Sequence, residues 1–119
     1  MANDSYRRML LSDFVYDSLD HMPNIREIGM AVENLPKLSE LHAVLDICYK
    51  LLNEGVQRTR QVWNLLKQCV ENLISQAKQE AKGIRNDGAY SLEQRADMNA
   101  IIENLSYIES DFNELRDEI

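Results

Sequence analysis

Two histidines each stand one helical turn from an aspartate, which is the spacing in this chain best suited to metal chemistry. Asp17 precedes His21 by four residues, and Asp46 follows His42 by four residues. On a helix this spacing places imidazole and carboxylate on one face, where both can ligate zinc. Asp13 would add a third ligand beside His21. A structural or catalytic ion also needs ligands from another helix, and the Glu-x-x-His pairs of di-iron bundles are absent, so we expect no metal centre.

Motifs for catalysis and cofactor binding are also missing from the sequence. It contains no glycine-rich phosphate loop, no Gly-Lys-Ser/Thr and no Cys-x-x-Cys. Acids such as Glu103 and Glu109 lie in a uniformly acidic stretch, where the sequence supplies no cause for a perturbed pKa. We therefore expect a non-enzymatic protein with no catalytic residue and no cofactor.

Two long heptad stripes of apolar residues determine the expected fold. Their alternating steps of three and four residues are typical of helices that pack on partner helices. The first stripe comprises Leu38, Leu41, Leu45, Cys48, Leu52, Thr59, Val62, Leu66, Cys69 and Leu73, and the second comprises Met98, Ile101, Leu105, Ile108, Phe112, Leu115 and Ile119.

The first stripe keeps its phase across Gly55, which predicts one continuous helix over residues 36–82. A break at Gly55 is the alternative, and it would give a closed four-helix bundle with one extra short helix. In the continuous helix, Cys48 and Cys69 would lie about 30 Å apart and could not form a disulfide. We expect both cysteines to be small hydrophobic residues of the core.

Residues that typically begin or end helices predict the bounds of the remaining helices. Pro23 is expected to end a first helix over residues 4–22, and Asn24 to open a short helix over residues 24–35. A turn near Gly83 precedes Ser91, which with Gln94 resembles a capping box for a last helix over residues 91–117. The sequence thus predicts one all-α domain over residues 1–119, an antiparallel helical bundle with a long central heptad helix and a C-terminal helical hairpin.

Charge is divided unevenly along a chain whose net charge is −7. Residues 55–85 hold six basic and two acidic residues, whereas residues 86–119 hold nine acidic and two basic ones. In a hairpin these segments would pair their opposite charges. Because the acidic chain repels a polyanion, we expect no direct binding to nucleic acid. The first residues lack the pattern of a signal peptide and no apolar run is long enough for a membrane span, so we expect a cytoplasmic location.

The apolar residues around Trp63 exceed what one partner helix can cover, so either a third helix of the chain or a protein partner must cover the remainder. We expect a protein–protein interaction module, acting as an adaptor, an escort chaperone or an inhibitor. The alternatives are a self-assembling structural subunit, including a homodimer, and an acidic nucleic-acid mimic that blocks a basic DNA- or RNA-binding protein. The candidate interface residues are Trp63, Val62, Leu66, Val70, Glu109, Glu114, Asp117 and Glu118.

Overall fold

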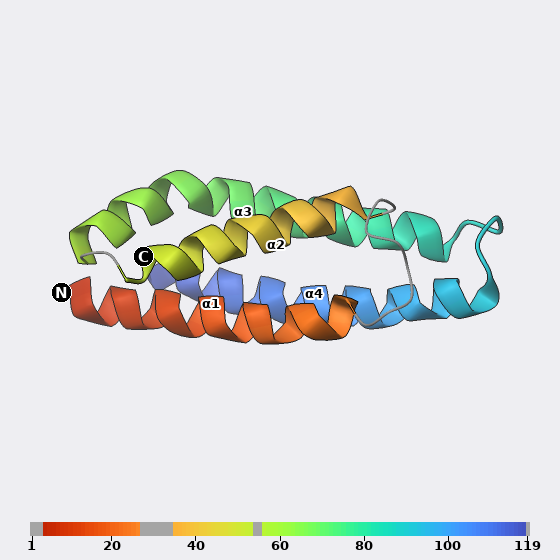
Figure 1. Cartoon of the computed structure of the whole chain (residues 1–119), viewed down its shortest axis with the longest axis horizontal. Helices are drawn as coiled ribbons and strands as arrows, with labels where there is room; N and C mark the ends of the chain where they lie inside the picture. The colour runs from red at the N-terminus through yellow and green to blue at the C-terminus, as the bar shows by residue number, and fades with distance from the viewer. Residues whose placement is uncertain (1–3, 27–34, 54–55, 119) are drawn as a thin grey trace.

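Four helices make up the regular structure of the residues that can be described. The structure, a computed structural model, describes residues 4–26, 35–53 and 56–118. These residues form α1 (Asp4–Arg26), α2 (Pro36–Leu51), α3 (Val56–Arg85) and α4 (Leu92–Glu118), with no strand among them. Successive helices run in opposite directions in a body of 51 × 22 × 20 Å (Figure 1). The expected all-α antiparallel bundle is therefore confirmed.

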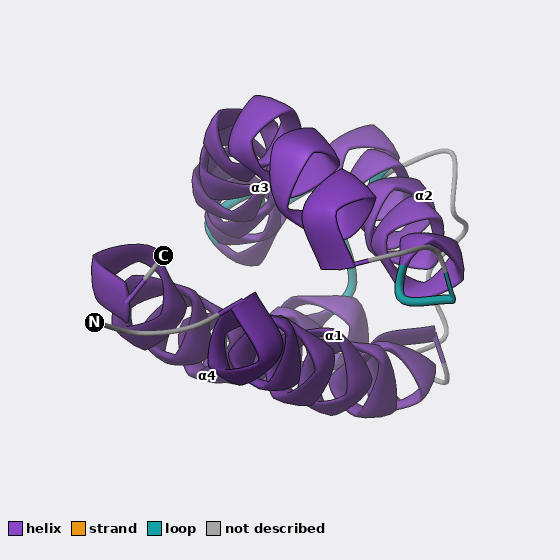
Figure 2. Cartoon of the chain, turned by 90° about the vertical axis from the view of Figure 1, so that its left-hand side faces the viewer, coloured by secondary structure: helices purple, strands orange, loops and turns teal. Residues whose placement is uncertain are grey.

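The helices form two layers, with α2 and α3 lying over α1 and α4 (Figure 2). Each helix packs on its neighbours, and α1 also contacts α3 across the diagonal of the bundle. The two longest helices, α3 and α4, form a hairpin that extends beyond α1 and α2 at one end (Figure 1). None of the helices in the described part of the chain has both the length and the apolar character needed to cross a membrane.

The predicted continuous helix over residues 36–82 is wrong, because the chain reverses direction after α2. Helix α2 ends at Leu51, and the N–H groups of Leu52 and Asn53 then donate to the carbonyl groups of Tyr49 and Lys50. Helix α3 begins at Val56 and runs back along α2 (Figure 1). Gly55 itself lies outside the described residues. A single helix would be about 70 Å long and would leave much of its stripe exposed, whereas the reversal buries that apolar surface.

The apolar stripe changes phase at this reversal. Leu38, Leu41, Leu45, Cys48 and Leu52 are buried, as predicted. On α3, however, Val62 and Leu66 are only half-buried and Cys69 is exposed, while the side chain of Thr59 lies outside the described residues. From residue 61 onward, the buried residues of α3 are instead Trp63, Val70, Leu73, Ile74, Ala77, Ala81 and Ile84. Because a reversal separates the two helices, the apolar face of each is set independently of the other.

The two cysteines therefore differ from their predicted positions. Cys48 is buried, as expected, but Cys69 is exposed, so its assignment to the core is wrong. Burial, with a smaller contribution from the nearby Cys69, raises the pKa of the Cys48 thiol to about 11. The predicted separation of about 30 Å held only for one continuous helix. Antiparallel packing of α2 on α3 brings the two residues to the same level of the bundle, and both are free thiols.

The hairpin of α3 and α4 agrees with the prediction in its buried stripe on α4 and in its charge pairing. Every described residue of the second stripe, from Met98 to Leu115, is buried, and Ile119 lies outside the described residues. Lys78 of α3 pairs with Glu109 of α4 at 3.3 Å, as the opposite charges of the two segments predict. Gly83 lies within α3 rather than beyond its end, because the helix continues to Arg85.

Helix α1 is longer than predicted. It continues through Pro23 to Arg26, so the expected end at Met22 and the expected helix start at Asn24 are both wrong. Pro23 lies in the last turn, where its missing N–H removes only one backbone hydrogen bond. The rest of the predicted short helix, residues 27–34, lies outside the described residues. Pro36 occupies the first turn of α2, as expected.

Three aromatic rings join α1, α3 and α4 in the core. The centroids of Phe14 and Trp63 are 5.9 Å apart, those of Phe14 and Phe112 are 5.9 Å apart, and those of Trp63 and Phe112 are 6.0 Å apart. Each pair meets edge to face, the geometry that aromatic quadrupoles favour. Trp63 is only 1% exposed. Helices of the same chain thus cover Trp63, Val70 and Ile74, whereas Leu65 stays 79% exposed.

Candidate functional site

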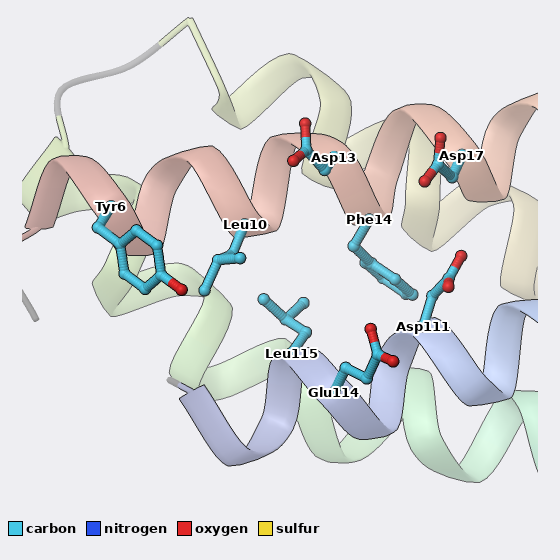
Figure 3. A pocket seen from close by; sticks show the side chains of 8 residues that line it. All are labelled: Tyr6, Leu10, Asp13, Phe14, Asp17, Asp111, Glu114 and Leu115. Atoms are coloured by element: carbon cyan, nitrogen blue, oxygen red, sulfur yellow. The ribbon is translucent and has the colours of Figure 1, made fainter.

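A groove between α1 and α4 combines apolar and charged side chains. Its cavity volume is about 570 Å³. We call it the acidic groove, and its lining residues are Tyr6, Leu10, Asp13, Phe14, Asp17, Asp111, Glu114 and Leu115 (Figure 3). Both walls come from antiparallel helices that are adjacent in space but distant in sequence.

The floor of the acidic groove is apolar. Leu10 of α1 points toward Leu115 of α4, and Phe14 of α1 points toward the part of α4 that carries Asp111 (Figure 3). Phe14 and Leu115 are buried and Leu10 is half-buried, so the floor is continuous with the core. Because the Phe14 ring also packs on Trp63 and Phe112, it has little freedom to close the groove. A ligand would thus meet a preformed apolar surface.

Carboxylates border this floor on both helices. Asp13 and Asp17 lie one turn apart on α1, and Asp111 and Glu114 lie one turn apart on α4 (Figure 3). None of the eight lining residues is basic. Burial raises the pKa of the Asp111 carboxyl, and the charges of Asp17 and Glu114 raise it further, while His21 lowers it. The groove therefore concentrates negative charge, and this is unfavourable until a cation balances it.

Helical periodicity explains why these acids lie at the groove. Phe14 and Ser18 of α1 and Phe112 and Leu115 of α4 turn inward to the core. Acids next to such core positions must lie at the edge of the apolar face, where two packed helices meet solvent. Asp17 of α1 thus lies near Asp111 of α4 where these two helices pack together.

The predicted interface residues whose side chains the structure describes do not form one site. Trp63 and Val70 are buried, and Val62 and Leu66 are half-buried on α3. Glu109 pairs with Lys78 and lines a smaller cavity of about 230 Å³ between α3 and α4. Of the six predicted residues whose side chains the structure describes, Glu114 alone lines the acidic groove.

Asp117 and Glu118 stand in the last turn of α4, and their side chains lie outside the described part of the structure. Since Trp63 and Val70 are inside the bundle, they are not accessible to a partner of the folded chain. Sequence reasoning missed Leu10 and Asp111 as site residues. The acidic character of both helices was visible in the sequence, but not the pairing of α1 with α4 that makes a groove.

The histidines considered as metal ligands make other contacts. His21 Nδ1 donates a hydrogen bond to the Asp17 carbonyl oxygen at 2.8 Å, and its ring lies 5.5 Å from that of Tyr107 on α4. His42 Nδ1 lies 3.3 Å from a carboxylate oxygen of Asp46. Within the described residues, no three histidine, cysteine, aspartate or glutamate side chains are grouped to hold a metal ion. His21 therefore contributes to the α1–α4 contact.

Comparison with protein-family models, with curated proteins and with solved structures found no match to this chain. The shape and charge of the acidic groove are therefore the guide to function.

Proposed function

We propose that this protein is a non-enzymatic protein-interaction module that binds a basic amphipathic helix of a partner protein in the acidic groove. The observation that carries this proposal is the combination of an apolar floor with carboxylates on both walls. Lysine and arginine have apolar stems and cationic ends, so they can cover the floor while their charges reach the walls. A helix laid in a groove is a common mode of peptide recognition.

The spacing of the acids defines the expected ligand. Asp13 and Asp17 are four residues apart, and Asp111 and Glu114 are three residues apart. A partner helix with basic residues one turn apart on each flank matches both pairs. An apolar side chain between these flanks would rest on Leu10 and Leu115. Adaptor, escort and inhibitor roles all require this binding step.

Electrostatics favours such a ligand over an uncharged one. The raised pKa of Asp111 reflects the cost of holding its charge in a half-buried place near Asp17 and Glu114. A cationic side chain removes this cost, since it places opposite charge beside each carboxylate. Binding should therefore weaken as salt concentration rises.

The experiment measures fluorescence anisotropy of a labelled leucine–lysine amphipathic peptide of about 18 residues, long enough for a helix of five turns. Replacing Asp13 and Asp111 together by asparagine should weaken binding about tenfold, because two charge pairs are lost. The matched control replaces Glu93 and Glu103 by glutamine, which removes the same charge from α4 outside the groove. Circular dichroism checks that each variant is folded.

A second variant distinguishes the contribution of the apolar floor to peptide binding from that of the carboxylates. Leu10→Ala should weaken binding at every salt concentration, because apolar contact is not screened. If Leu10→Ala has no effect while the asparagine variant loses binding, charge alone attracts the peptide, as in an acidic nucleic-acid mimic. If both charge variants weaken binding equally, the acidic groove is not the binding site.

A further inference from the structure

The exposed side of α3 is uncharged over five turns, which is unusual in a chain with 28% charged residues. The charged residues of this stretch, Lys67, Glu71 and Lys78, are half-buried rather than exposed. We call the exposed residues between 61 and 79 the neutral α3 face: Gln61, Asn64, Leu65, Gln68, Cys69, Asn72, Ser75, Gln76 and Gln79.

The other helices expose acids to solvent. The exposed residues of α1 include Asp13 and Asp20, those of α2 include Glu40, and those of α4 include Glu93 and Glu103. Charged residues normally cover the solvent side of a surface helix. Because the chain has a net charge of −7, two copies repel one another through their acidic faces. The neutral α3 face allows a second copy to approach without placing acids against acids.

The chemistry of this face is self-complementary. Glutamine and asparagine side chains each carry both donors and an acceptor, so an amide can pair with the same amide of another copy. A twofold-symmetric dimer needs this property, since each surface then meets itself. Leu65 adds an apolar contact with a side chain that is 79% exposed.

Helix α2 extends the apolar part of this surface. The Lys37 N–H donates to the Glu80 carboxylate, which aligns the start of α2 with the end of α3. Antiparallel pairing from this point brings Ile47 to the level of Cys69. Ile47 is 48% exposed, so α2 presents an apolar side chain at the level of the middle of the neutral α3 face.

We propose that the neutral α3 face is a homodimer interface, in which two α3 helices cross antiparallel about a twofold axis near Cys69. This residue lies at the middle of the face, where a twofold axis places it opposite its own copy. The layer formed by α1 and α4 lies on the other side of the core (Figure 2). Dimerisation therefore leaves both acidic grooves open, and the dimer binds two ligands or a ligand with two helices.

The test measures molar mass by light scattering after size-exclusion chromatography, from about 1 to about 200 µM, since association depends on concentration. The wild-type chain should shift from monomer to dimer. Leu65→Glu places two acids near the twofold axis and should raise the dissociation constant at least about tenfold. The matched control is Leu92→Glu on α4, where the leucine is 80% exposed but outside the face, and it should dimerise like wild type.

A crosslinking measurement locates the interface. Bismaleimidoethane should join two copies through the exposed Cys69, because Cys48 is buried, and Cys69→Ser should abolish the crosslink. A wild-type chain that stays monomeric over the whole concentration range overturns the proposal. A dimer that Leu65→Glu and Leu92→Glu affect equally, or one that bismaleimidoethane does not crosslink through Cys69, also overturns it.

Discussion

Helices α2 and α4 begin in different ways, although both lie in the same bundle. At the start of α4, the Ser91 N–H donates to Gln94 Oε1 at 3.1 Å and the Gln94 N–H donates to Ser91 Oγ at 3.1 Å. At the start of α2, Leu35 provides no side-chain cap. The Lys37 N–H donates instead to the Glu80 carboxylate of α3, at 3.1 Å to Oε1 and 3.3 Å to Oε2.

This difference distinguishes a local signal from a tertiary one. The cap of α4 needs only four consecutive residues, so it can form before the bundle does. The cap of α2 comes from a residue 43 positions away and exists only when α2 packs on α3. Glu80 therefore connects the stability of one helix to the position of another.

The largest effect is expected at the tertiary cap. Glu80→Ala should lower the free energy of unfolding by about 1–3 kcal/mol, because it leaves partly buried N–H groups at the start of α2 without their acceptor. Urea denaturation followed by circular dichroism measures this loss. The control, Gln79→Ala, alters an exposed neighbour on α3 and should change stability little. Equal losses in the two variants would show that α2 does not depend on Glu80.

A smaller effect is expected at the local cap. Ser91→Ala should cost about 1 kcal/mol, the usual value for loss of a serine N-cap. Ser110→Ala, at an exposed serine within α4, is the control and should not destabilise the protein. Amide hydrogen exchange sharpens the comparison: Ser91→Ala should speed exchange in the first turn of α4, and Glu80→Ala in the first turn of α2. Faster exchange in α2 on loss of Ser91 would contradict a purely local cap.

The smallest effect is a pH dependence of the tertiary cap. Burial raises the pKa of the Glu80 carboxyl, and this outweighs the opposing influence of the Lys37 and Leu38 N–H groups and of the Lys37 charge, while Glu40 raises the pKa further. The Glu80 carboxyl therefore binds a proton more tightly in the folded state than in the unfolded chain. The contribution of Glu80 to the free energy of unfolding should therefore increase as the pH falls through the raised pKa of the folded state. It should level off below the pKa of this carboxyl in the unfolded chain.

Comparing wild type with Glu80→Gln between about pH 7 and about pH 4 isolates this dependence, because the other titrating groups are common to both proteins. Wild type should gain stability relative to the variant as the pH is lowered. A relative loss over this range would mean that the cap holds the ionised carboxylate more strongly than burial disfavours it.

Features that depend on residues close together in the chain could be predicted before the fold was known. The buried stripe from Met98 to Leu115 follows from helical periodicity, and the cap of α4 follows from Ser91 and Gln94. The pairing of Lys78 with Glu109 follows from the opposite charges of two segments joined by a short turn. In each case the interaction lies within one helix or across one hairpin, so spacing along the chain is sufficient to predict it.

Which helix faces which could not be predicted from spacing along the chain. The reversal after Leu51 moved the buried face of α3 by one position, which put Trp63 in the core and Cys69 in solvent. The acidic groove joins Asp13 of α1 to Asp111 of α4, two residues from opposite ends of the chain. Many helix arrangements satisfy the same periodicity, and the one that buries the most apolar surface depends on all four helices at once.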